Sequence, residues 1–203
     1  VGEDGVTHHG VFDMAAFGAV PGLTIAAPMN EPELRNMMYT ALGSGHPFMI
    51  RYPRGHGEGL PWRGEKFETL PVGRGRRLRE GADVALLTVG TVGNAAARAA
   101  GRAAAEGVSV AHYDLRFVKP LDEALLDEVG RKFRRVVTVE DGSLRGGVGE
   151  AVAAFFNGRG YDVRVQRLGI GDEWVEHGTP GQLYALCGYD EEGILRALLD
   201  TRA

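Results

Sequence analysis

The first ten residues of the chain hold the two side chains best suited to proton transfer. Asp4 and His8 stand four residues apart in a loop interrupted by Gly2, Gly5 and Gly10. Glycine lets a backbone approach a ligand closely, and an imidazole can donate or accept a proton near neutral pH. These residues therefore predict a proton-handling site, although the same composition is also typical of a polar surface loop.

A metal site at the adjacent histidines His8 and His9 is not expected. Neighbouring loop residues rarely converge on one ion, and no third ligand follows at a useful spacing. The sequence therefore predicts no metal ligands in this chain.

The second candidate site is the Arg-Tyr-Pro-Arg-Gly segment at residues 51–55. It follows a predicted parallel strand, and ligands of open α/β sheets bind at the carboxyl ends of such strands. A guanidinium there can hold a phosphate through two parallel hydrogen bonds. The alternative is that the arginines form salt bridges at the strand end.

Three further features are expected to be structural. Gly-Gly-Val-Gly at residues 146–149 precedes a predicted helix, but Val152 stands where a dinucleotide-binding turn needs its third glycine, which favours a tight turn. The basic runs at residues 74–79 and 131–135 favour solvated faces over a nucleic-acid surface, because the net charge of the chain is −4. Cys187 lies among apolar residues and is expected to be buried and inert.

The elements that would position these residues begin with a strand–helix–strand unit. Residues 23–28 form a short apolar run ended by a proline, which predicts a buried strand after a loop over residues 1–20. Asn30 and Glu33 are typical of a capped helix start, and the glycines at 43–45 end the helix. Residues 47–52 are the next strand, so the unit predicts a parallel sheet.

A second α/β unit is expected after a linker. Residues 55–72 contain glycines, prolines and mixed charges with no period, which predicts the linker. Strands and helices then alternate, and this pattern predicts a doubly wound α/β domain over residues 73–203. Its strands are expected at 84–89, 108–115, 136–139 and 163–168, and its helices at 91–106, 122–129, 147–156, 180–187 and 190–201.

Composition excludes several classes of protein. The single cysteine among 203 residues excludes a disulfide framework, and no apolar run approaches the ~18 residues of a membrane span. The net charge of −4 has the wrong sign for a general nucleic-acid binder. Because the chain starts at Val1 without a signal-peptide pattern, we expect it to be a piece of a longer protein.

Two motifs at the start of the chain connect it to a known family. Gly-Glu-Asp-Gly-x-Thr-His at residues 2–8 resembles the pyrimidine-binding domain of transketolase-like thiamine-diphosphate enzymes. The continuation to Phe-Asp at residue 13 is similar to the 1-deoxy-D-xylulose-5-phosphate synthase family, whereas transketolases typically read Thr-His-Gln-Pro. Further segments resemble the same family, so the resemblance covers essentially the whole chain; they are residues 27–28, 30–31, 38–40, 50–55, 113–122, 139–142 and 146–149.

The resemblance implies the C-terminal portion of a three-domain enzyme. Residues 1–54 would end the pyrimidine-binding domain, and residues 73–203 would form the transketolase-like C-terminal domain. The family condenses pyruvate with glyceraldehyde 3-phosphate, releases CO₂, and so makes a precursor of isoprenoids, thiamine and pyridoxal phosphate. By motif, His8 would handle a proton at an oxygen of the intermediates, Asp4 would bind the acceptor's hydroxyl or aldehyde, and Arg54 would hold its phosphate.

The resemblance also implies cofactors and partners. Thiamine diphosphate and Mg²⁺ are expected, with their diphosphate and metal motifs in an N-terminal part outside this chain. That part is an expected partner, the enzyme is expected to be a cytoplasmic homodimer without nucleic-acid or membrane partners, and the fragment alone is expected to be inactive.

Two alternatives stay open. A transketolase or the β-subunit of a 2-oxoacid dehydrogenase is a second enzyme interpretation. An isolated dimerisation or regulatory α/β module is the non-enzyme interpretation.

Overall fold

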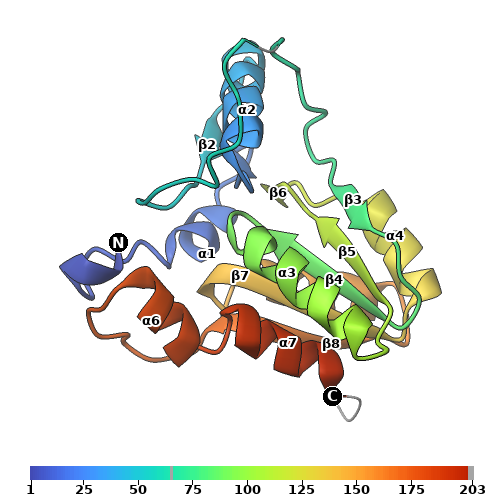
Figure 1. The fold of residues 1–203 in the computed structure, drawn as a ribbon. Helices are drawn as coiled ribbons and strands as arrows, with labels where there is room; N and C mark the ends of the chain where they lie inside the picture. Colours follow the sequence, from blue (N-terminus) through green and yellow to red (C-terminus); the bar gives the residue numbers. More distant parts are fainter. Residues whose placement is uncertain (65, 201–203) are drawn as a thin grey trace.

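The computed structural model describes residues 1–64 and 66–200. It contains two sheets that are flanked by helices (Figure 1), so the α/β fold class predicted from the sequence is confirmed. Within the described ranges, no helix combines the length and the apolar character needed to cross a membrane.

The smaller sheet has the strand order β2–β1–β6. β1 (Thr24–Ala26) and β2 (Phe48–Ile50) pair in parallel, and the helix α2 (Glu31–Gly43) connects them along the chain. This is the arrangement that the strand–helix–strand pattern predicts. The side chain of Asn30 caps this helix, because its Oδ1 accepts a hydrogen bond of 3.1 Å from the backbone N–H of Glu33.

A strand from the second half of the chain completes the smaller sheet. β6 (Phe117–Lys119) pairs antiparallel with β1, and Phe117 packs with Met37 of α2. Arg116, just before β6, has a φ of 58°, and its guanidinium donates two hydrogen bonds of 2.8 Å to the carboxylate of Glu33. β6 is not predicted from the sequence, because three residues are too few to show a period.

The larger sheet has the strand order β3–β5–β4–β7–β8. Four of its strands are parallel and correspond to the four predicted ones, whereas β3 pairs antiparallel with β5 at the edge, so the sheet is mixed. The bounds are β3 (Arg76–Arg79), β4 (Val84–Val89), β5 (Val110–Asp114), β7 (Arg135–Ser143) and β8 (Arg164–Ile170).

The edge strand β3 corrects the prediction for the first basic run. The guanidinium of Arg76 lies 3.1 Å from the carboxylate of Asp114 and 2.9 Å from that of Glu33, and Arg77 lies 3.0 Å from Glu128. These arginines are therefore paired across elements and do not simply face solvent. Their charges also disfavour the pairing of a further strand at this edge.

Helices cover both faces of the larger sheet (Figure 1). α3 (Val92–Ala105) and α7 (Glu191–Leu199) pack on one face, and α4 (Glu123–Lys132) and α5 (Val148–Gly158) pack on the other. This three-layer arrangement is the doubly wound architecture that the alternation predicted. The last predicted helix extended to residue 201, which lies outside the described residues.

The N-terminal segment contains more structure than expected. A 3₁₀ turn, η1 (Gly2–Asp4), and a short helix, α1 (Asp13–Gly18), lie within the predicted loop, and Met14 of α1 is buried. α1 packs beside β7, and the helix α6 (Pro180–Leu186) packs beside η1. The loop that carries Asp4 and His8 is therefore held between the two halves of the chain.

Among the described residues of the segment 55–72, none forms a helix or strand. The segment returns along α2, where Arg35 donates to the carbonyl oxygen of Lys66 and Thr40 accepts from the backbone N–H of Leu70. Leu70 is buried, so the end of this connection packs on the smaller sheet.

Candidate functional site

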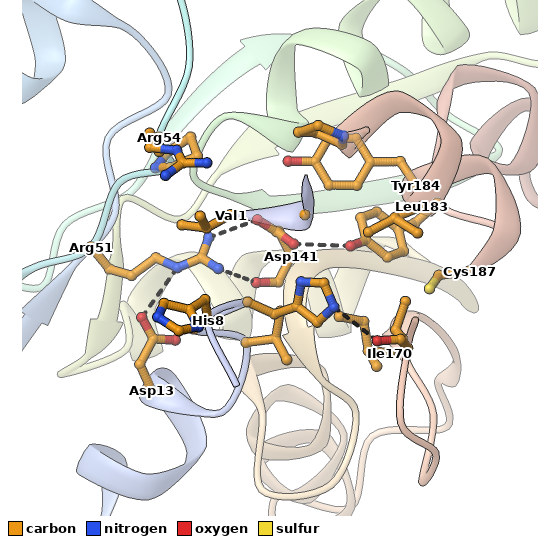
Figure 2. Close-up of a pocket in the computed structure, with 18 of the residues that line it drawn as sticks. Val1, His8, Asp13, Arg51, Arg54, Asp141, Ile170, Leu183, Tyr184 and Cys187 are labelled. Atoms are coloured by element: carbon orange, nitrogen blue, oxygen red, sulfur yellow. Dashed lines mark hydrogen bonds and ion pairs between the residues drawn. The ribbon is translucent and has the colours of Figure 1, made fainter. Parts of the chain in front are cut away.

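A cavity of about 160 Å³ lies where the N-terminal loop and the end of β2 meet the second α/β unit (Figure 2). Charged and polar side chains from the first 54 residues form one wall. Side chains from β8, α6 and the segments that follow them form the other, largely apolar wall, namely Ile170, Val175, Leu183, Tyr184, Cys187 and Tyr189.

The structure brings two of the three predicted site residues into direct contact. The guanidinium of Arg54 donates to both carboxylate oxygens of Asp4, at 2.7 and 3.1 Å. This pairing lowers the pKa of Asp4 and raises the pKa of Arg54. Both side chains are substantially exposed, so a ligand anion can compete with Asp4 for the guanidinium.

His8 lines the same cavity as Arg54. Its Nδ1 lies 2.9 Å from the hydroxyl of Thr7, and a hydroxyl can either donate or accept, so this contact fits either tautomer of the ring. The neighbouring His9 has a different task, because its Nε2 donates a hydrogen bond of 2.8 Å to the carbonyl oxygen of Val175. His9 thus connects the loop to the second α/β unit.

Arg51 lies deeper in the cavity wall than Arg54. Its side chain is 10% exposed, against 58% for Arg54. Nε donates to Asp13 at 3.3 Å, and the two terminal nitrogens donate to the carboxylate and the backbone carbonyl of Asp141, at 3.1 and 2.6 Å (Figure 2). Tyr189 adds a hydrogen bond of 2.9 Å from its hydroxyl to the same carboxylate.

Asp13, Asp141 and Tyr189 are site residues that the sequence does not predict. Asp13 ends the Phe-Asp motif and Asp141 follows β-branched strand residues, but their contacts with Arg51 span 38 and 90 residues. No local pattern predicts pairing over such separations. For segment 51–55 the sequence left phosphate binding and salt bridges open, and in this structure Arg51 and Arg54 both form salt bridges.

The glycine-rich turn at residues 146–149 does not offer an anion site. The carboxylate of Glu140 accepts hydrogen bonds of 2.8 Å from the backbone N–H groups of Val148 and Gly149. A Cβ at Gly147 would lie 2.5 Å from Oε2 of Glu140, so this glycine is needed for the close approach. An internal carboxylate therefore occupies the N-terminus of α5, and the tight-turn interpretation is confirmed.

Glu140 and Cys187 illustrate two effects of burial near the site. Burial raises the pKa of Glu140, while the N–H groups of Gly149 and Val148 lower it in part. Burial also raises the pKa of the Cys187 thiol, which disfavours the reactive thiolate. Cys187 is half-buried rather than fully buried as expected, because one side of it faces the cavity.

The side chains present do not fit a metal–diphosphate site. In the part of the chain that the structure describes, no three His, Cys, Asp or Glu side chains are grouped to hold a metal ion. The one glycine-rich helix start considered from the sequence is filled by Glu140. Neither Mg²⁺ nor a diphosphate is therefore assigned to residues of this chain.

Two family models match the chain. The pyrimidine binding domain of transketolase matches residues 1–58, and the C-terminal domain of transketolase matches residues 73–194. The chain is also 56% identical over 204 aligned residues to a 1-deoxy-D-xylulose-5-phosphate synthase of Bacteroides fragilis, an alignment that covers 100% of this chain and 31% of that protein. A synthase of the same name from Symbiobacterium thermophilum is 45% identical, with 95% of this chain and 30% of the relative covered.

Solved structures give the same fold. A protein described as split gene transketolase, inactive beta4 tetramer, has a TM-score of 0.78 and 27% identity, and covers 93% of this chain and 60% of that one. A transketolase variant from Pichia stipitis has a TM-score of 0.71 at 20% identity, covering 98% of this chain and 28% of that one. The chain spans about a third of the length of the curated relatives that it matches.

Proposed function

Because the chain belongs to the transketolase family, we propose that it serves as the C-terminal part of a 1-deoxy-D-xylulose-5-phosphate synthase. The reaction would be the condensation of pyruvate with glyceraldehyde 3-phosphate, with loss of CO₂, in the supply of isoprenoid, thiamine and pyridoxal precursors. The proposal is supported by alignments with two proteins of that name, which cover 100% and 98% of this chain.

The proposal keeps the division of the chain that the sequence predicts. Residues 1–54 are assigned to the end of the pyrimidine-binding domain, residues 55–72 to a linker and residues 73–203 to the C-terminal domain. A cytoplasmic homodimer also belongs to the proposal. Thiamine diphosphate and Mg²⁺ are assigned to the part of the enzyme outside this chain.

The observation that carries the proposal is the meeting of two distant segments at one cavity. Asp4 lies 50 residues before Arg54, yet their charged groups are in contact, and His8 lines the cavity with Arg54. An acid–base group beside a guanidinium suits a phosphorylated aldehyde acceptor. We assign His8 to proton transfer at the substrate oxygen, Arg54 to the acceptor phosphate and Asp4 to the acceptor hydroxyl or aldehyde.

The Asp4–Arg54 pair suggests how the acceptor is received. A phosphate oxygen can replace the Asp4 carboxylate on the guanidinium, because an exposed ion pair is weak. The displaced carboxylate is then available for a hydroxyl of the same acceptor. Replacement of the Asp4 carboxylate by phosphate on Arg54 would thus allow both the phosphate contact and the hydroxyl contact to form.

The test is an assay of the complete protein that contains this chain. Pyruvate consumption and CO₂ release in the presence of glyceraldehyde 3-phosphate are expected. His8→Ala should lower kcat by about 10²–10⁴-fold, and Arg54→Ala should mainly raise the KM for the phosphorylated acceptor. An unchanged KM in the Arg54 variant would remove the phosphate assignment.

The assay also separates the alternatives. Ketose transfer without pyruvate consumption would favour a transketolase, and turnover of a 2-oxoacid without the aldehyde would favour a dehydrogenase subunit. The 203-residue chain alone is expected to be inactive and to bind thiamine diphosphate poorly. The similar split-gene transketolase, which is described as an inactive tetramer, is in keeping with this expectation.

A further inference from the structure

Arg51 is a junction between three segments of the chain. It directly follows β2 and lies three residues before Arg54. Its partner Asp13 begins α1, five residues after His8, and its other partner Asp141 lies in β7 of the larger sheet. One guanidinium therefore links both candidate catalytic loops to each other and to the second α/β unit.

The chemistry of the junction requires arginine. Burial lowers the pKa of Arg51, but the charges of Asp141 and Asp13 outweigh burial and leave the pKa above its ordinary value. The side chain is therefore a permanent cation. Its planar fork reaches three acceptors at once, whereas the ammonium of a lysine presents a single point of charge.

In the second α/β unit, Asp141 is fixed by its place in β7 and by a hydrogen bond from Tyr189. The backbone carbonyl of Asp141 belongs to β7, and its carboxylate accepts from Tyr189, which is 2% exposed. Main-chain bonds reinforce the same place, because the carbonyl of Val11 accepts a 3.0 Å hydrogen bond from the N–H of Ser143. The N-terminal loop thus has a fixed reference in the larger sheet.

We propose that Arg51 is a positioning residue that sets the distance between the His8 loop and Arg54, and thereby sets the preference for a phosphorylated acceptor. This inference rests on the proposed function. Arg51 acts through Asp13 and Asp141 and does not itself bind the acceptor phosphate. A displacement of about 1 Å at a reacting group can cost on the order of 10²-fold in rate, so a modest shift of the loop is measurable.

The experiment compares two acceptors in the complete enzyme. For each variant, kcat/KM is measured with D-glyceraldehyde 3-phosphate and with unphosphorylated D-glyceraldehyde, and the ratio is the phosphate preference. Arg51→Met should lower this ratio by about tenfold or more, and Arg51→Lys should lower it less. Asp141→Asn should lower it as well, although Arg51 is still present, and the double variant should fall no further than Arg51→Met alone.

A matched control is available in the same chain. Arg135 is also partly buried, and it donates to the backbone carbonyls of Ala197 and Leu198 at the end of α7, outside the cavity lining. Arg135→Met should lower Tm without changing the phosphate preference by more than about twofold. Tm of every variant shows whether loss of stability alone accounts for the effect.

The variant Arg54→Ala distinguishes the phosphate assignment of Arg54 from the positioning role of Arg51. If Arg54→Ala loses the phosphate preference while folded Arg51→Met and Asp141→Asn keep it, the positioning role is refuted and the phosphate assignment stands. If Arg54→Ala keeps the preference, the phosphate assignment itself fails. An Arg51→Met effect that adds fully to that of Asp141→Asn would indicate direct contact of Arg51 with substrate and would also overturn the positioning role.

Discussion

The carboxylate of Glu140 at the start of α5 provides the sharpest test of how the structure is stabilised beside the site. Glu140 is 1% exposed and accepts two backbone hydrogen bonds, each of 2.8 Å. Glu140→Ala leaves two buried N–H groups without partners. Hydrogen bonds to a charged group contribute about 1.5–3 kcal/mol each, so the gross loss is about 3–6 kcal/mol.

The net loss should lie at the lower end of that range. Burial raises the pKa of Glu140, which means that its ionised form carries a desolvation cost that alanine removes. We therefore expect a loss of about 3 kcal/mol in the free energy of unfolding, and a fall in Tm of about 6–12 °C for a chain of this size. Glu140→Gln keeps one acceptor oxygen and should lose about half as much.

Urea unfolding of the chain, followed by circular dichroism, measures the effect. Glu150 is the matched control, because it is an exposed acid on the same helix that accepts from the backbone N–H of Gly146. Glu150→Ala should lose less than about 1 kcal/mol. Equal unfolding midpoints for Glu140→Ala and the unmodified chain would refute the claim that this carboxylate satisfies the start of α5.

Three further predictions concern the elements that support the site. Burial raises the pKa of Asp114 to about 6 from 3.8, so the contribution of this carboxyl to stability is complete below about pH 4 and is lost as the pH rises through about 6. Asp114→Asn should therefore flatten the dependence of Tm on pH in this window, and an unchanged slope would contradict the assignment. Asn30→Ala removes the cap of α2 and should lower the free energy of unfolding by about 1 kcal/mol in urea titrations, whereas Asn30→Asp should not. Arg116→Met leaves Arg76, among the described residues, as the ion-pair partner of the buried Glu33 carboxylate and should lower the free energy of unfolding by about 1.5–3 kcal/mol in the same titrations; a neutral result would mean that the pair is dispensable.

Local patterns in the sequence were sufficient for most of the larger sheet. β4 is an apolar run apart from Thr88 and β7 contains a β-branched run, whereas β8 alternates Val165 and Leu168 with polar side chains, and such patterns are a property of neighbouring residues. β3 and β6 were not predicted, and the reason differs between the two strands. β3 holds three arginines and Leu78, and the acidic partners of Arg76 and Arg77, Asp114 and Glu128, lie far along the chain. β6 is three residues long.

The candidate site divides in the same way. The types and spacing of Asp4 and His8 marked one loop, and the position of Arg54 after a strand marked another, but neither feature predicts that Asp4 and Arg54 meet. The distinct tasks of Arg51 and Arg54 were also hidden, because two arginines in one short motif differ only in what surrounds them. Arg51 and Arg54 differ in their burial and in their long-range ion pairs, and neither property can be read from the sequence.

The strand β6 connects parts of the chain that lie on either side of residues 55–72. Along the sequence the chain divides between the two family matches, at residues 58 and 73. In space, β6 lies beyond that division yet bonds to β1 before it, and the Arg116–Glu33 ion pair crosses at the same place. After a cut within residues 55–72, the β1–β6 pairing and the Arg116–Glu33 ion pair would therefore be contacts between two separate pieces.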